Sequence, residues 1–297
     1  MRFTALGRTG WLFDAVEACV GAGHECVLVA TRPASPEYTR TEDDFAALAE
    51  RLGVPFLEHL PGPEHPQAEV AISMNWPTLI GGLVRERFAH GVINAHPGDV
   101  PRFRGNACPN WAIIAGETQV VLTLHEMVDE LDAGPVLDKR AFPLDDDTYI
   151  ADVYRWLATA VPEAFVAVLD GLERGDLRAT PQEGEAVRCY PRRPEDGLLD
   201  FARPAAELAR IVRASGEPFA GAFTHLDGER LTVWRARAEA LGHAALGVPG
   251  QVTQRRENGD VAVLCGDGAV LVLEEVEAGG QRGAPAEAVR SPRARLG

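Results

Sequence analysis

The sequence predicts an α/β fold, in which a mostly parallel, Rossmann-like sheet forms an amino-terminal domain and a small, OB-like β-barrel forms a carboxy-terminal domain. The chain has 297 residues, a length that fits two domains. Short apolar runs alternate with amphipathic stretches as far as about residue 145, which is typical of βα units. Beyond Gly184 the pattern changes to period-two alternation between glycine-containing turns, which is typical of antiparallel strands.

The first half of the chain supplies the parallel sheet. Strands are expected at residues 2–6, 26–30, 54–57, 69–73, 92–95 and 120–124. Apolar residues at helical spacing predict helices over residues 11–20, 43–52 and 79–88. A longer helix is expected over residues 148–172, because three aspartates precede it and Gly175 follows it.

The second half begins with an extended connector over residues 186–203, where prolines, a glycine and charged residues exclude a helix. A short helix is expected at residues 204–213, and strands at residues 221–225, 231–235, 250–253, 261–265 and 269–276. The tail after Gly279 is rich in Gly, Pro, Ala and Arg, and we expect it to be loose. The predicted domains are therefore residues 1–185 and 204–297, joined by the connector.

Composition excludes several classes of function. The 29 basic and 44 acidic residues give a net charge of −15, which repels nucleic acid and anionic lipid. No apolar stretch reaches the roughly 18 residues that would span a bilayer, and acidic residues interrupt the start before a signal peptide could form. The five cysteines show neither a CxxC pair nor zinc spacing. We expect a cytoplasmic protein with reduced thiols, no metal, and no membrane or nucleic-acid partner.

The run Gly7-Arg8-Thr9-Gly10 follows the first strand and invites a comparison with dinucleotide-binding loops. The dinucleotide fingerprint has three glycines, whereas this turn has two, and Thr31-Arg32 stands where an acidic residue would end the next strand. The run therefore predicts a tight turn between a strand and a helix.

The segment from Asn94 to Gly134 contains the candidate catalytic residues. Asn94 and His96 are separated by one residue at the end of an apolar strand, so their side chains share one side of the sheet, at the edge where parallel sheets bind ligands. Each residue taken alone has a simpler interpretation, as a strand-end cap or a hydrogen-bonded turn histidine. Asp132 lies in a polar turn after a later strand, where most acids bond the local backbone.

Taken together, residues 94–97 (NAHP), 104–109 (RGNACP), 111–113 (WAI) and 132–135 (DAGP) resemble the formyltransferases that use N10-formyltetrahydrofolate. That family includes methionyl-tRNA formyltransferase and the sugar N-formyltransferases. Residues 193–197 and 211–224 resemble the start of the family's carboxy-terminal barrel. The resemblance implies that residues 1–185 are the catalytic domain, that N10-formyltetrahydrofolate is the co-substrate, and that Asn94, His96 and Asp132 are catalytic.

These residue types suit attack of an amine on a formyl carbon. Asn94 can donate a hydrogen bond to the resulting oxyanion, and His96 can donate a second one and pass protons. Asp132 would stabilise His96, and the sequence leaves open which of the two is the base. By resemblance, the pteridine slot is formed by two segments, although the first could equally be a packed loop. The residues concerned are Met74, Asn75, Trp76, Leu79, Ile80, Val128, Asp129 and Leu131.

The sequence gives less information about which amine accepts the formyl group than about the catalytic residues. The acidic charge and the compact segment 31–41 argue against tRNA, which needs many phosphate contacts. Residues 33–38, 104–111 and 188–192 look most like formyltransferases of nucleotide-linked amino sugars. The candidate substrate-binding residues are Arg102, Arg104 and Arg192 for a diphosphate, and Tyr190 for a base. A connector cluster in which arginines pair with Glu195 and Asp196 is the alternative.

Other acceptors and classes stay open. They are a small non-sugar amine such as hydroxyornithine, methionyl-tRNA, water in a formylfolate hydrolase, and a non-catalytic folate-binding relative. Because such enzymes are often dimers, the small barrel could dock a second subunit, giving a homodimer.

Overall fold

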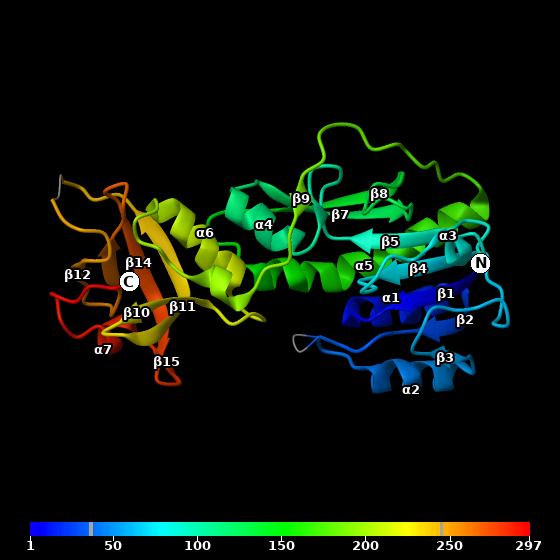
Figure 1. Ribbon diagram of the computed structural model, residues 1–297, viewed down its shortest axis with the longest axis horizontal. Coiled ribbons are helices and arrows are strands. Elements are labelled where there is room, and N and C mark those ends of the chain that lie inside the picture. The colour runs from blue at the N-terminus through cyan, green and yellow to red at the C-terminus, as the bar shows by residue number, and fades with distance from the viewer. Residues whose placement is uncertain (36–37, 244–245) are drawn as a thin grey trace. The chain divides into compact units, whose positions relative to one another are not determined.

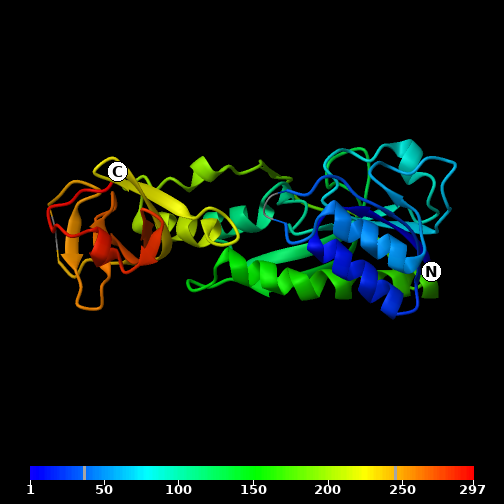
Figure 2. The same ribbon diagram turned by 90° about the horizontal axis from the view of Figure 1, so that it is seen from below.

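The computed structural model describes residues 1–35, 38–243 and 246–297, so Pro36 and Glu37 of the stretch 33–38 lie outside the described residues. The chain forms two compact units (Figures 1 and 2). The amino-terminal unit consists of Met1–Cys108, Val120–Phe142 and Tyr154–Tyr190. The carboxy-terminal unit consists of Pro109–Gln119, Pro143–Val153 and Pro191–Gly297.

The amino-terminal unit is built on a seven-stranded sheet (Figure 1). Its order is β3 (Phe56–Leu57), β2 (Glu25–Ala30), β1 (Arg2–Gly7), β4 (Val70–Met74), β5 (Val92–His96), β7 (Gln119–Glu126) and β8 (Val136–Pro143). The pairs β2–β3, β1–β2, β1–β4 and β4–β5 are parallel, whereas β7 runs antiparallel to β5. The predicted mostly parallel α/β sheet is confirmed. The edge strand β8 was not predicted, because it alternates half-buried with exposed residues and carries charges at Asp138, Lys139 and Arg140.

The turn between β1 and α1 (Gly10–Gly21) is the predicted tight turn. Thr9 caps the helix, since its Oγ1 accepts a hydrogen bond from the Leu12 amide at 3.2 Å. Gly7 has φ +157°, and a Cβ there would lie 2.1 Å from the Met74 carbonyl oxygen. The glycine therefore permits the close approach of β1 to β4.

Three further helices belong wholly or largely to this unit. They are α2 (Glu42–Leu52), α3 (Gly82–Arg85) and α5 (Ile150–Arg174). The helix expected over residues 79–88 is wrong in extent, because Pro77 and the glycine pair at 81–82 restrict it to the four residues of α3. Helix α4 (Cys108–Ala115) was not predicted. In the described ranges, no helix combines the length and the apolar character needed to cross a membrane.

The carboxy-terminal unit contains an antiparallel sheet packed against α6 (Ala205–Ser215). Its strands are β10 (Ala222–Leu226), β11 (Glu229–Glu239), β12 (Val252–Arg255), β13 (Val261–Leu264), β14 (Val270–Ala278) and β15 (Gln281–Gly283). The order is β10-β11-β14-β13-β12, with β15 beside β14. Leu208, Val212 and Leu273 are among the buried residues of its core.

The tail after Gly279 is ordered, which corrects the expectation that it is loose. It forms β15 and a short helix, α7 (Pro285–Ala288), and then bridges both end strands of the sheet. Leu296 pairs with Leu226 at the end of β10, while Arg295 pairs with Gln251 beside β12. Leu296 is 2% exposed. The composition of the tail does not reveal this role, because the segment is held by backbone hydrogen bonds and by two buried side chains that are far apart in the sequence, Val289 and Leu296.

We expect the Leu296→Ala substitution to lower the free energy of unfolding by about 2–5 kcal/mol, because it removes a buried side chain by which the tail packs into the core of the carboxy-terminal unit. Denaturant unfolding measures this change. The control is Leu246→Ala, which removes the same atoms from a fully exposed side chain. Equal stability of the two variants would contradict the closing role of the tail.

Candidate functional site

The site is built on two neighbouring strands, β5 and β7. In their antiparallel register, Asn94 lies opposite His125 and His96 lies opposite Thr123. All four polar side chains are buried, although the strands are otherwise apolar. Such a cluster is stable only when its members hydrogen bond to one another or to the backbone.

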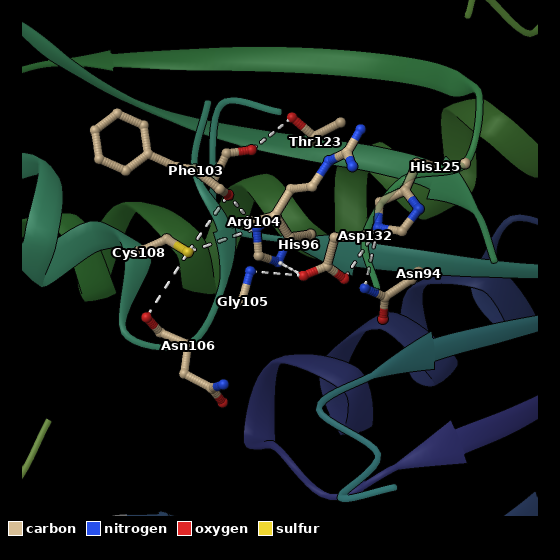
Figure 3. A network of polar contacts seen from close by, with 12 residues as sticks. Asn94, His96, Phe103, Arg104, Gly105, Asn106, Cys108, Thr123, His125 and Asp132 are labelled. Carbon is tan, nitrogen blue, oxygen red and sulfur yellow. Dashed lines mark hydrogen bonds and ion pairs between the residues drawn. The ribbon is translucent and has the colours of Figure 1, made fainter. Parts of the chain in front are cut away.

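Asp132 completes the cluster from the turn that follows β7 (Figure 3). Its Oδ2 lies 3.6 Å from Nδ1 of His96, and its Oδ1 lies 3.6 Å from Nε2 of His125. Oδ2 also accepts a hydrogen bond from the Gly105 amide at 2.8 Å. The structure thus brings the predicted trio of Asn94, His96 and Asp132 together within one unit.

The hydrogen bonds of His96 determine which ring nitrogen carries the proton. Nε2 lies 2.7 Å from the Phe103 carbonyl oxygen, which can only accept a hydrogen bond, so Nε2 is protonated. In the neutral ring, the lone pair is therefore on Nδ1, facing Asp132. Burial lowers the pKa of His96 below 6.5, although the charge of Asp132 opposes this shift. The lowered pKa favours the neutral form of the His96 ring at pH 7.

His125 holds the amide of Asn94, and the sequence analysis missed it. Its Nδ1 donates to the Glu126 carbonyl oxygen at 2.9 Å, which leaves the Nε2 lone pair to accept a hydrogen bond from Asn94 Nδ2 at 3.3 Å. The second N–H of the Asn94 amide is directed elsewhere and suits an incoming oxygen. The signal in the sequence was a pair of polar residues two positions apart, Thr123 and His125, in the buried part of β7.

Asp132 is ionised at neutral pH. Burial raises the pKa of its carboxyl group, but attraction to His96 in its protonated form, interaction with His125 and the hydrogen bond from the Gly105 amide outweigh burial and lower the pKa to about 2. Its backbone has φ +49°, an uncommon conformation for a residue with a side chain. The site therefore sets a carboxylate anion against a neutral imidazole.

Close packing fixes the loop behind His96. A Cβ on Gly98 would lie 2.3 Å from both Nε2 of His96 and the Phe103 carbonyl oxygen. Thr123 Oγ1 donates to the Gly98 carbonyl oxygen at 2.8 Å, and the buried thiol of Cys108 donates to the Phe103 carbonyl oxygen at 3.4 Å. The carbonyl that orients His96 is therefore itself held in place.

The residues expected to form the pteridine slot lie at the ends of β4 and β7. Leu79 is 67% exposed and Val128 is 38% exposed, whereas Met74 and Ile80 are buried. Trp76 packs against a buried cluster, as the packed-loop alternative expects. Asn75 has φ +57°, Asp129 is exposed, and Leu131 is half-buried.

Arg85 joins the two segments of this slot. Its Nη1 donates to the Ile80 carbonyl oxygen at 3.2 Å, and its Nη2 pairs with the Asp129 carboxylate. The two segments, which are far apart in the sequence, are thus connected beside the site.

The four candidate substrate-binding residues are not all in one unit. Arg104 donates to Glu130 and Gln182, while Arg102 is exposed with its guanidinium near the Phe103 ring. Tyr190 is 67% exposed, and the Arg188 guanidinium lies over its ring.

Arg192 belongs to the carboxy-terminal unit. Its guanidinium donates to the backbone carbonyls of Ala214 and Asp196 and to Ser215 Oγ. Burial lowers its pKa. These contacts are to backbone and hydroxyl oxygens, whereas the alternative interpretation of the sequence expected pairing with the carboxylates of Glu195 and Asp196.

One group outside the site has metal-ligating side chains. Ligand atoms of His24, Asp170 and Glu173 lie within 4.8 Å of one another. They are already paired: the amino group of Met1 lies 3.0 Å from His24 Nδ1 and 2.8 Å from Glu173, and His24 Nε2 lies 3.3 Å from Asp170. An ion-pair network accounts for this group.

Comparison with known proteins gives matches over both units. A family model described as formyl transferase matches residues 63–169, and one described as formyl transferase, C-terminal domain, matches residues 192–292. The structure of HypX from Aquifex aeolicus in complex with tetrahydrofolic acid is 23% identical, with a TM-score of 0.60; the match covers 97% of this chain and 47% of that chain. This chain therefore spans about half the length of the HypX chains that it matches.

Two other solved structures match over most of their own length. An N-formyltransferase from Helicobacter canadensis, in complex with folinic acid and dTDP-3-aminofucose, is 12% identical with a TM-score of 0.69, covering 91% of this chain and 98% of that chain. Methionyl-tRNA formyltransferase from Clostridium thermocellum is 17% identical with a TM-score of 0.54, and the match covers 80% of this chain and 92% of that chain. At these identities the structures demonstrate a shared fold.

We expect Gly98→Ala to destabilise the protein by about 1–3 kcal/mol, because the new methyl group overlaps the His96 ring and the Phe103 carbonyl. Denaturant unfolding measures this loss of stability. Gly21→Ala is the matched control, since a Cβ there meets nothing within 4 Å. If Gly98→Ala is as stable as the control, the packing described around His96 is wrong.

We expect His125→Gln to raise the pKa of His96, because repulsion from the protonated form of His125 lowers that pKa, whereas a glutamine side chain cannot be protonated. A pH titration of the His96 ring signals by NMR measures the change. Glutamine can still accept the hydrogen bond from Asn94. An unchanged or lower His96 pKa would contradict the contact between these groups.

Proposed function

Because the chain belongs to the formyl transferase family, we propose that it is a folate-dependent N-formyltransferase, which moves the formyl group of N10-formyltetrahydrofolate to a primary amine. The observation that carries the proposal is the meeting of an amide donor, a neutral imidazole and an ionised carboxylate in one buried cluster. The residues are Asn94, His96 and Asp132, supported by His125.

The chemistry follows from the protonation states. The neutral amine attacks the formyl carbon, and the charge that develops on the formyl oxygen receives a hydrogen bond from the unused N–H of Asn94. His96 accepts the amine proton at Nδ1, and Asp132 stabilises the imidazolium that forms. As the carbon–nitrogen bond to the folate breaks, the same proton passes to N10 of the folate. We assign the base to His96, because Asp132, with a pKa of about 2, is a weak proton acceptor.

The folate slot is proposed for the two segments that Arg85 connects. Exposed apolar side chains at Leu79 and Val128 suit the faces of a pteridine ring, and nearby backbone groups suit its polar edge. Met74, Asn75, Trp76, Ile80, Asp129 and Leu131 complete the proposed set.

We propose a nucleotide-linked amino sugar as the acceptor. The Helicobacter canadensis relative is a complex with dTDP-3-aminofucose, and the net charge of −15 disfavours tRNA. The exposed ring of Tyr190 suits stacking with a base, and Arg102 suits a diphosphate. Arg104 would have to leave Glu130 to contact phosphate, and Arg192 would have to give up its contacts with Asp196 and with the end of α6.

An assay with N10-formyltetrahydrofolate and a panel of amines tests the proposal. The panel contains nucleotide-linked 3-amino and 4-amino sugars, hydroxyornithine, methionyl-tRNA and a reaction without amine. Formamide product with a nucleotide sugar, detected by mass spectrometry, is the expected result. Product with hydroxyornithine or methionyl-tRNA alone would overturn the sugar assignment, and formate release without amine would indicate a hydrolase. No turnover, together with folate binding, would indicate a non-catalytic relative.

We expect Asn94→Ala to lower kcat by about 10²- to 10³-fold, because it removes the hydrogen-bond donor to the oxyanion. Asp132→Asn should cost at least as much, because the imidazolium then lacks its counter-charge. Steady-state kinetics with the best acceptor measures both. Asp147→Asn, an exposed carboxylate of the carboxy-terminal unit, is the control and should retain full activity. Wild-type kcat in Asp132→Asn would refute the assigned chemistry.

A further inference from the structure

The segment at residues 180–189 contacts both loops that carry the site. Thr180 pairs with Val136, just beyond the Asp132 turn, through backbone hydrogen bonds of 2.7 and 2.8 Å. At the other end, β9 (Arg188–Cys189) lies parallel to β6 (Arg104–Gly105) in the loop that follows His96. One continuous segment thus connects the His96 loop to the Asp132 turn.

Gln182 lies between these two anchor points, and its side-chain amide has four partners. Nε2 donates to the backbone carbonyl oxygens of Asp132 at 2.8 Å and Gly134 at 2.7 Å. Oε1 accepts hydrogen bonds from Arg104 Nη2 at 2.8 Å and Nε at 3.1 Å. Carbonyl oxygens only accept and guanidinium groups only donate, so the amide orientation is unambiguous.

The Asp132 turn needs such support. Its backbone occupies a conformation that costs of order 1 kcal/mol or more, and its carboxylate must stay within reach of two imidazoles. The Gly105 amide holds the carboxylate, and Gln182 holds the carbonyl groups of Asp132 and Gly134, the residues on either side of Ala133. Arg104 fixes Gln182 in turn and also pairs with Glu130 in the same turn.

We propose that Gln182 is a positioning residue that holds the Asp132 carboxylate against His96 and that it acts through backbone contacts rather than by touching substrate. This inference rests on the proposed function for its kinetic consequences. It also gives Arg104 a role within the protein, as the residue that orients Gln182.

The first test is Gln182→Met, which keeps the side-chain length and removes the amide. We expect kcat to fall about 10- to 100-fold, because a displacement of the order of 1 Å at a reacting group costs that much. The KM for N10-formyltetrahydrofolate should change less than about twofold. The pKa of His96, followed by NMR, should fall, because the Asp132 charge that raises it moves away. Glu183→Met, at an exposed neighbouring position, is the matched control.

The second test is Gln182→Glu, which remains informative if the methionine variant does not fold. An ionised glutamate keeps the contact with Arg104 but repels the carbonyls of Asp132 and Gly134. The protonated form can donate one hydrogen bond to them. The ratio of variant kcat to wild-type kcat should therefore rise as the pH falls.

The outcomes separate this inference from the proposed function. Wild-type kcat and an unchanged His96 pKa in Gln182→Met would overturn the positioning role, as would a pH-independent ratio in Gln182→Glu. If the wild-type protein transfers no formyl group, the proposed function fails. The His96 titration in Gln182→Met then still decides whether Gln182 positions Asp132.

Discussion

A carboxylate buried between two imidazoles is the interaction on which the site depends. An ionised carboxyl group inside a protein is costly unless hydrogen bonds and nearby charge compensate for its lost hydration. Here attraction to the protonated forms of His96 and His125 and the hydrogen bond from the Gly105 amide supply that compensation and lower the pKa of Asp132 to about 2. The Phe103 carbonyl oxygen keeps the proton of the neutral His96 ring on Nε2, so Nδ1, which faces the anion, is the nitrogen available to take up a proton.

The surrounding structure can be understood as the means of keeping these groups in place. The antiparallel pairing of β5 with β7 sets Asn94 beside His125, so the amide that would bind the oxyanion is oriented by a hydrogen bond. Gly98 permits the Phe103 carbonyl to approach the His96 ring. The segment at residues 180–189 links the loop after His96 to the Asp132 turn through backbone pairing. Each of these three features acts on the backbone or on a ring nitrogen, and none depends on a charged side chain at the surface.

Much of this arrangement could be predicted from the sequence, because it follows from local pattern. The apolar strand ending in Asn94 and His96, the tight turn at residues 7–10 and the mostly parallel sheet were predicted from patterns among neighbouring residues. The contribution of His125 could not be predicted in the same way, since it depends on the register between two strands. The edge strand β8 and the closing role of Leu296 were missed for a related reason: backbone pairing with distant segments stabilises them, and their side-chain patterns are weak. Arg104 was identified as a phosphate ligand from its charge, but its contacts with Gln182 and Glu130 depend on the fold.

The central claim is that His96 is neutral at pH 7, with its proton on Nε2 and its lone pair on Nδ1 facing the Asp132 carboxylate. Nitrogen-15 NMR of protein labelled at histidine distinguishes the two neutral tautomers and the imidazolium. We expect a protonated Nε2 and an unprotonated Nδ1 for His96 at pH 7. A proton on Nδ1 at that pH, in either the other tautomer or the cation, would contradict it.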